Sequence, residues 1–252
     1  FLILGNGSTF AEKIISSQPN IIYILADDMG TGDVKAYNPE CQFPTPNLDQ
    51  MAANGMKFTD VHTSSAVCTP TRYGILTGRY SWRTYKKNGV LHGHSPHLID
   101  TERETVASLL KKKGYQTACV GKWHLGMDWT AKNGEEVNTS FGHNVDFSVR
   151  VKNGPLAVGF DYYYGIAASL NMPPHAFIEN DLIKSELVHA PDKQAIKDLG
   201  LVGAKQGWVA KDFDQSDVLP AITRKTVTWI KEHQEKNSDL PFFVYMPLNA
   251  PH

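Results

Sequence analysis

Charged and nucleophilic side chains of this 252-residue chain follow several short apolar runs, at points where they could meet. Asp27 and Asp28 come directly after one run, Lys122 and His124 after a second, and His252 after a third. Apolar runs of this kind are typical of buried strands in a parallel sheet. Because sites in open α/β sheets form at the carboxyl ends of the strands, we expect these side chains to converge on one sheet edge.

The two adjacent carboxylates favour a cation. Neighbouring aspartates repel each other, and both stay ionised only where a cation or strong donors compensate. Oxygen ligands suit calcium or magnesium rather than zinc. Asp27 and Asp28 are therefore candidate ligands of a hard divalent cation, although an aspartate pair after a strand is also a common turn or helix cap.

A cysteine and an arginine share the start of a predicted helix. Pro70 suits the first turn of a helix and Gly78 suits its end. Cys68 then lies at the helix N-terminus, where the helix dipole stabilises an anion, and Arg72 follows one turn later. On these residues alone, a half-buried cysteine beside a structural arginine is the simpler interpretation.

Strand-like and helix-like segments alternate along the chain. We expect strands over residues 21–26, 56–62, 115–120 and 241–246, the first of them buried on both faces. We expect helices over residues 46–54 and 218–236, and a third from a capping box at residues 101–104 to residue 113. The alternation predicts an α/β fold with a mainly parallel sheet flanked by helices.

Composition excludes several classes of protein. The 25 basic and 26 acidic residues give a formal net charge of −1, which argues against a nucleic-acid partner. No apolar run approaches the roughly 20 residues of a membrane span. Three cysteines are too few for a disulfide scaffold.

Several motifs, in order, resemble one enzyme family. Cys68-Thr69-Pro70-Thr71-Arg72 matches the Cys-x-Pro-x-Arg signature of the type I sulfatases, and Gly121-Lys122-Trp123-His124-Leu125-Gly126 matches their second signature. Further likeness lies in Ala26-Asp27-Asp28-Met29-Gly30, in Thr45-Pro46-Asn47-Leu48-Asp49, in Leu76-Thr77-Gly78-Arg79-Tyr80 and in residues 159–165. The resemblance runs from about Pro19 to His252.

The resemblance implies a fold, a cofactor and a substrate class. The fold would be alkaline-phosphatase-like, and the reaction would be hydrolysis of sulfate esters, with a sulfated sugar or polysaccharide as the expected substrate. Cys68 would be oxidised to formylglycine by formylglycine-generating machinery. Asp27, Asp28 and position 68 would bind calcium, with magnesium as the second choice.

The same resemblance suggests a role for each remaining candidate. A hydrated aldehyde at position 68 would attack sulfur, activated by the metal and by Arg72, while Lys122 would hold a sulfate oxygen. His252 would protonate the leaving alcohol, and His124 would deprotonate the second hydroxyl. Ser169 falls where some members carry a sulfate-contacting residue. His92, His94 and His97 lie in a Gly/Ser/Pro loop, and we expect them at the surface.

The two ends of the chain carry expectations of their own. Residues 1–11 resemble the end of a secretory signal peptide cut after Ala11, so we expect residues 1–19 to be a leader and the protein to be periplasmic or secreted. In the family, two further metal ligands and a sulfate-binding lysine come later in the chain. We therefore expect residues 20–252 to be the N-terminal part of a C-terminally truncated catalytic domain.

Two other functions fit the same residues. Some phosphonate monoester hydrolases and phosphodiesterases resemble this pattern and use the same modified cysteine. A relative that only binds sulfated glycans would keep the fold, although binding alone does not require an oxidisable cysteine.

Overall fold

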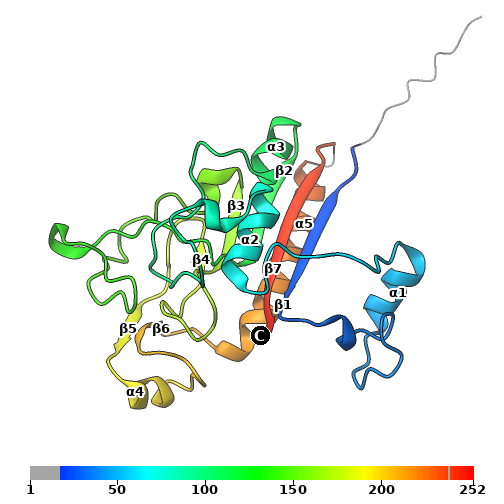
Figure 1. Ribbon diagram of the computed structural model, residues 1–252. Helices are drawn as coiled ribbons and strands as arrows, with labels where there is room; N and C mark the ends of the chain where they lie inside the picture. Colours follow the sequence, from blue (N-terminus) through cyan, green and yellow to red (C-terminus); the bar gives the residue numbers. More distant parts are fainter. Residues whose placement is uncertain (1–17, 238) are drawn as a thin grey trace, which may run out of the picture.

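A five-stranded sheet forms the centre of the protein in the computed structural model, which describes residues 18–237 and 239–252 (Figure 1). The strand order is β1-β7-β2-β3-β4, with β1, β7, β2 and β3 parallel and β4 antiparallel at the edge. The strands are β1 (Ile21–Asp27), β2 (Gln116–Lys122), β3 (Tyr162–Ile166), β4 (Ile178–Glu179) and β7 (Phe242–Pro251). A separate pair consists of β5 (Leu187–Ala190) and β6 (Gly207–Ala210).

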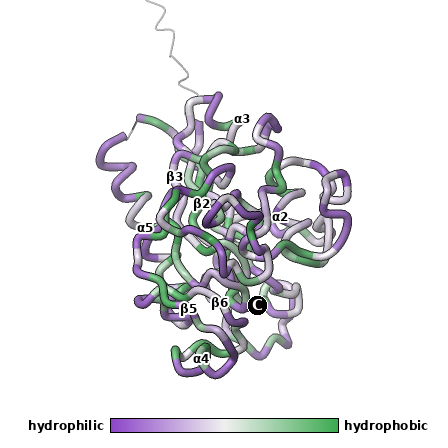
Figure 2. Tube along the Cα trace, turned by 90° about the vertical axis from the view of Figure 1, so that its left-hand side faces the viewer, coloured by the Kyte–Doolittle hydropathy of each residue, from purple (hydrophilic) through white to green (hydrophobic). Residues whose placement is uncertain are grey.

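Alternate residues of β7 enter two different hydrophobic cores, because successive side chains of a strand point to opposite faces. Phe243 and Tyr245 belong to the first core, which contains residues of α2 (Cys68–Thr77) and α3 (Val106–Lys112). Phe242 and Val244 belong to the second core, which contains residues of α4 (Lys193–Asp198) and α5 (Val218–Lys236). Figure 2 shows the apolar segments gathered along the strands in the interior of the molecule. The sheet is thus covered by helices on both faces.

The remaining helices are short or peripheral. The helix α1 (Pro46–Asn54) buries none of its residues and lies on the far side of β1 from the rest of the sheet (Figure 1). Short 3₁₀ turns complete the fold: η1 (Thr31–Asp33), η2 (Ser81–Arg83), η3 (Lys132–Gly134), η4 (Pro155–Val158) and η5 (Gln215–Asp217). Among the described residues, no helix has both the length and the apolar character needed to span a bilayer.

Two glycines let β2 and β3 meet closely just before the site. Gly121 and Gly165 are register partners, and Gly121 has a φ of 146°. A Cβ on Gly165 would lie 1.7 Å from the Gly121 carbonyl oxygen, so only glycine fits there.

The predicted α/β class is confirmed, as are the helices over residues 46–54 and 218–236. Three details of the prediction are wrong. Residues 56–62 form no strand, and within the part of the chain that the structure describes β1 has β7 as its single neighbour. The third helix begins at Val106 rather than Thr101, because Thr105 and Ser108 cap each other reciprocally.

The third error concerns β1, which is not buried on both faces. Ile22 is 49% exposed and Ile24 is 53% exposed, because β1 is an edge strand of the sheet among the described residues. The predicted signal peptide and its cleavage site fall on residues 1–11, outside the described residues, so the export prediction stays a prediction.

Candidate active site

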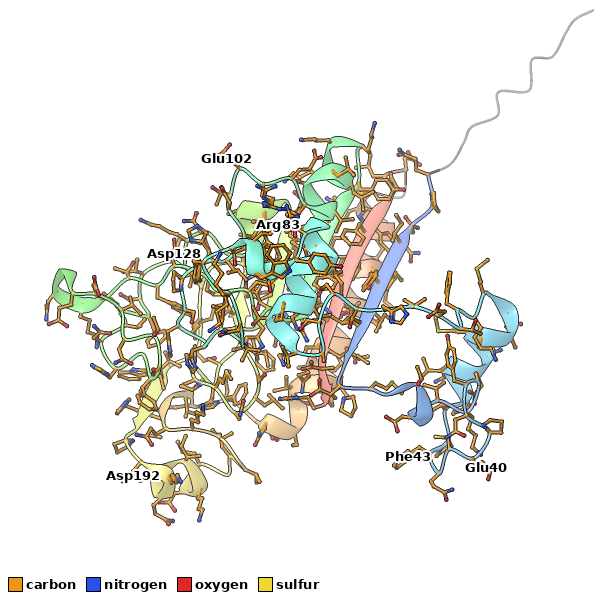
Figure 3. The ribbon with its side chains drawn as sticks, in the orientation of Figure 1. Glu40, Phe43, Arg83, Glu102, Asp128 and Asp192 are labelled. Carbon is orange, nitrogen blue, oxygen red and sulfur yellow. The ribbon has the colours of Figure 1, made fainter. Side chains whose placement is uncertain are left out.

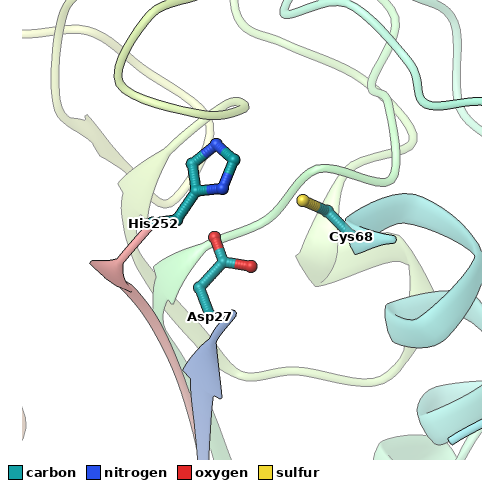
Figure 4. A group of neighbouring side chains, drawn as sticks. All are labelled: Asp27, Cys68 and His252. Carbon is teal, nitrogen blue, oxygen red and sulfur yellow. The ribbon is translucent and has the colours of Figure 1, made fainter. Parts of the chain in front are cut away.

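Side chains from three strand ends and one helix start lie close together. Asp27 ends β1, Lys122 ends β2, His252 follows β7, and Cys68 is the first residue of α2. One ligand atom from each of Asp27, Cys68 and His252 lies within 4.8 Å of the others (Figure 4). The adjoining cleft has a volume of about 200 Å³ and is lined in part by Asp27, Asp28, Cys68 and Arg72. The structure therefore brings together the residues that the sequence placed at the sheet edge.

A buried ion pair stands at the centre of this cluster. The Lys122 ammonium contacts Oδ2 of Asp27, and Lys122 Nζ lies 3.3 Å from Cys68 Sγ. The Lys122 side chain is fully buried, and a buried charge needs a partner of this kind. Burial alone would raise the pKa of Asp27, but the contact with Lys122 and the charges of Arg72 and His252 outweigh it and lower that pKa. Asp27 is thus held as a carboxylate.

Arg72 connects the ends of three strands. Its Nη1 donates to the Lys122 carbonyl at 2.6 Å, and its Nη2 donates to the Leu248 carbonyl at 3.2 Å. Nη2 also lies 3.5 Å from Oδ1 of Asp27. Its Nε is buried without a partner among the described residues. Most of the Arg72 fork is therefore engaged in holding β2, β7 and Asp27 together, while its charge still faces the cleft.

Thr69 positions the strand-end loops, a role that sequence reasoning missed. Its hydroxyl donates to the His124 carbonyl at 2.9 Å and accepts from the Leu91 amide at 3.1 Å. Thr69 is completely buried. A threonine next to Cys68 in a predicted helix gives no indication that its hydroxyl bonds to two distant loops. This role could therefore not be predicted from the sequence.

His124 is buried and neutral. Its Nε2 donates to the Leu91 carbonyl at 2.8 Å, so the lone pair lies on Nδ1, which is buried without a partner among the described residues. Burial and the charges of Lys122 and Arg72 lower the pKa of His124 to about 3. Its φ of 55° is unusual for a non-glycine residue, and so is the φ of 67° at Asp28. Strained backbone of this kind clusters at functional sites.

His252 and Asp28 form a histidine–carboxylate pair beside the pair of Lys122 and Asp27. The His252 Nδ1 contacts Oδ2 of Asp28, and the His252 amide donates to the Asp27 carbonyl at 3.0 Å. The Asp28 carboxylate thus faces His252 and does not belong to the group formed by Asp27, Cys68 and His252. Asp28 stays a predicted metal ligand.

Asn249 is a further candidate that the residue pattern did not single out. Its side-chain oxygen Oδ1 is buried and has no partner among the described residues. Asn249 lies in β7 two residues before Pro251, which is the register partner of Asp27. A carboxylate and an amide oxygen at one sheet edge are ligands that fit a hard divalent cation.

The other predicted residues lie deeper than expected. Ser169 is buried just after β3, and its hydroxyl forms no hydrogen bond with the site residues in the part of the chain that the structure describes. The prediction that His94 lies at the surface is wrong, because its ring packs 5.6 Å from Trp129 and 6.0 Å from Phe147. His97 is half-buried and pairs with Asp128.

Comparison with known proteins identifies the family. Residues 19–252 match the family model named Sulfatase. The chain belongs to the sulfatase family. It is 32% identical to the N-acetylgalactosamine-6-O-sulfatase of Bacteroides thetaiotaomicron over 92% of this chain and 48% of that protein. It is 38% identical to mouse arylsulfatase G over 97% of this chain and 43% of that protein.

Solved structures show the same fold. One comes from work on glycosaminoglycan metabolism by Bacteroides thetaiotaomicron; it has a TM-score of 0.76 and 32% identity, over 94% of this chain and 52% of that one. This sulfatase-family chain thus spans about half the length of the relatives it matches.

Proposed function

We propose that this protein hydrolyses sulfate esters, with a sulfated sugar or polysaccharide as its substrate. The observation that carries the proposal is the convergence of Cys68 with Lys122, Arg72 and Asp27 at the family signature positions. The substrate class follows from relatives whose names refer to N-acetylgalactosamine-6-sulfate and to glycosaminoglycans.

The charges of the site suit an anionic ester. A sulfate ester repels nucleophiles until its charge is neutralised, and preorganised cations in a dry site do this best. Lys122 is fully buried beside Cys68, so its ammonium is placed to hold a sulfate oxygen next to the nucleophile at position 68. Arg72 supplies a second fixed positive charge, and its two backbone contacts keep it in place.

A divalent cation completes the proposed site. We assign Asp27, Asp28, position 68 and Asn249 to hold calcium, with magnesium less favoured. When bound, the cation would supply Lewis-acid stabilisation of the developing charge. Formylglycine at position 68 would give an oxygen ligand in place of the thiol, which suits a hard cation better.

The two histidines are placed for separate proton transfers. The unpartnered Nδ1 of neutral His124 can accept a proton. His252 follows β7, and its ring contacts the Asp28 carboxylate, which orients the ring for the role of general acid.

The decisive experiment compares wild type with Cys68→Ala in the full-length protein co-expressed with formylglycine-generating machinery. We expect Cys68→Ala to abolish sulfate release from sulfated sugars and to leave thermal unfolding nearly unchanged. Cys41→Ala is the matched control, because Cys41 is a loop thiol outside the cluster. Unchanged sulfate release by Cys68→Ala would refute the assigned nucleophile.

Two further measurements separate the alternatives. Faster turnover of phosphorus esters than of sulfate esters would favour a phosphonate monoester hydrolase or phosphodiesterase, whereas glycan binding without release would favour a binding protein. The mass of the tryptic peptide holding Cys68 reports the aldehyde, and a lower unfolding temperature after chelation, restored by calcium, reports the cation independently of turnover.

A further inference from the structure

A basic pocket lies at the far end of α2 from Cys68. Its volume is about 440 Å³, and three arginines line it: Arg79, Arg83 and Arg103. Arg79 comes two residues after the last residue of α2, and Arg83 ends the 3₁₀ turn η2. Figure 3 labels Arg83 near the end of α2 that lies away from the C-terminus marked in Figure 1. Ten residues of helix span about 15 Å, so this pocket is separate from the candidate active site.

None of these three guanidinium groups is neutralised by an ion pair among the described residues. The arginines elsewhere do find carboxylates: Arg72 lies near Asp27, Arg150 contacts Asp181 and Arg224 contacts Asp217. In a chain with a net charge of −1, three unpaired arginines around one pocket are a local excess of positive charge.

The acidic side chain that lines the pocket does not neutralise this positive charge. Asp100 is the only acid among the residues that line the pocket, and its Oδ1 accepts the Glu102 amide at 3.0 Å. His97 also lines the pocket, and its ring pairs with Asp128, which is not one of the lining residues. Three arginines against one aspartate give the pocket a net positive charge of two.

Arg83 is held without losing its charge. Its guanidinium carbon lies 5.1 Å from the centroid of the Trp82 ring, and a cation–π contact orients a guanidinium while leaving its hydrogen-bond donors open. Tyr80 stacks on Trp82 at 5.9 Å, and both rings are more than half exposed. The pocket therefore has open forked donors beside an exposed aromatic pair.

We propose that this pocket is a second anion-binding site, which takes a sulfate group of a polyanionic saccharide. Arginine forks match the oxygens of such a group bidentately, and the flanking rings offer flat apolar surface to the rest of the saccharide. The proposal concerns binding alone, so it does not depend on chemistry at Cys68.

The test is calorimetric titration of the full-length protein carrying Cys68→Ala, which prevents turnover. The probes are a sulfated hexasaccharide and, separately, inorganic sulfate at constant ionic strength. We expect Arg83→Gln together with Arg103→Gln to weaken hexasaccharide binding at least about tenfold. The control is Arg150→Gln, whose guanidinium already has a carboxylate partner, and we expect it to change binding less than about twofold.

Each outcome decides the question. Loss of hexasaccharide binding in the double variant supports the proposal. If inorganic sulfate shows no arginine-dependent binding, the ligand of the pocket is the saccharide and not a free anion. Arginine-dependent binding of inorganic sulfate alone would overturn the saccharide assignment and leave a site for a free oxyanion. Equal affinities in parent, double variant and control would overturn the site itself. If the double variant does not fold, the same titrations are made with Arg83→Gln alone, because Arg83 is exposed and its replacement should not disturb the fold.

Discussion

The Nζ of Lys122 lies 3.3 Å from the Sγ of Cys68 while it contacts the carboxylate of Asp27. One buried cation thus links the proposed nucleophile position to the proposed metal ligand, across elements that are far apart in the sequence. This relationship makes the stability of the fold and the chemistry of the site depend on the same side chain.

The first prediction concerns this buried pair. Lys122→Met takes the closest cation away from the buried Asp27 carboxylate and leaves it the longer 3.5 Å contact with Arg72, so we expect a loss of about 3–5 kcal/mol in the free energy of unfolding, measured in urea with chelator present. Lys122→Met combined with Asp27→Asn should lose less than the sum of the single changes. Lys112→Met, which breaks an exposed pair with Glu104, should cost less than about 1 kcal/mol. Additive losses in the double variant would contradict the coupling.

The second prediction concerns proton donation by His252. We expect His252→Ala to slow hydrolysis of sugar sulfates much more than that of activated phenyl sulfates, because only a poor leaving group needs a proton. Asp28→Asn, which removes the partner of the His252 ring, should show the same trend more weakly. Equal losses on the two substrate types would rule out His252 as the acid.

The third prediction concerns acid stability and His94. Burial lowers the pKa of His94 to about 3, with smaller contributions from His175 and His92, whereas an unfolded histidine titrates near about 6.5. Between these two pH values the histidine is protonated in the unfolded chain and neutral in the folded chain. The free energy of unfolding therefore falls as the pH decreases from about 6.5 toward 3, by up to about 1.4 kcal/mol per pH unit.

The variant His94→Leu tests this linkage. It removes the titrating group from an apolar surrounding of Trp129 and Phe147, so we expect a shallower fall of unfolding free energy below pH 6.5. His143→Gln, at an exposed position, serves as the control and should keep the wild-type slope. An unchanged slope in His94→Leu would show that His94 does not contribute.

The fourth prediction concerns the close contact of β2 and β3. Gly165→Ala would place a Cβ 1.7 Å from the Gly121 carbonyl oxygen, so we expect a loss of about 3 kcal/mol or more, or no soluble protein. Gly154→Ala is the matched control, because its Cβ would meet only Met127 at an ordinary 3.7 Å. Similar unfolding free energies in the two variants would contradict the clash.

Much of this architecture could be predicted from local signals. Apolar runs correctly predicted the strands β1, β2 and β7. The polar residues after these runs predicted the position of the site, because parallel strands end at one edge of the sheet. The wrong predictions concern segments whose structure depends on contacts with distant parts of the chain. The run at residues 56–62 pairs with no strand among the described residues. Two capping patterns follow one another, at Thr101 and at Thr105, and the helix begins after the second, whose threonine also donates to the Val158 carbonyl.

Side-chain contacts between distant parts of the fold could not be predicted from the sequence. The threonine pattern did not reveal that Thr69 reaches His124, and a Gly/Ser/Pro loop did not reveal that His94 is packed between aromatic rings. The unpaired arginines around η2 became visible only when the positions of all carboxylates were known.

The place of β7 between β1 and β2 also sets an order of events during synthesis. The sheet lacks the strand that joins β1 to β2 until Phe242 to Pro251 have left the ribosome, roughly 170 residues after Cys68 and thus about 10–35 s later. Until then Asp27 and Lys122 have no strand to hold them together, and the core that contains Tyr73 and Leu76 of α2 lacks Phe243 and Tyr245. The surroundings of Cys68 are therefore completed only when β7 joins the sheet.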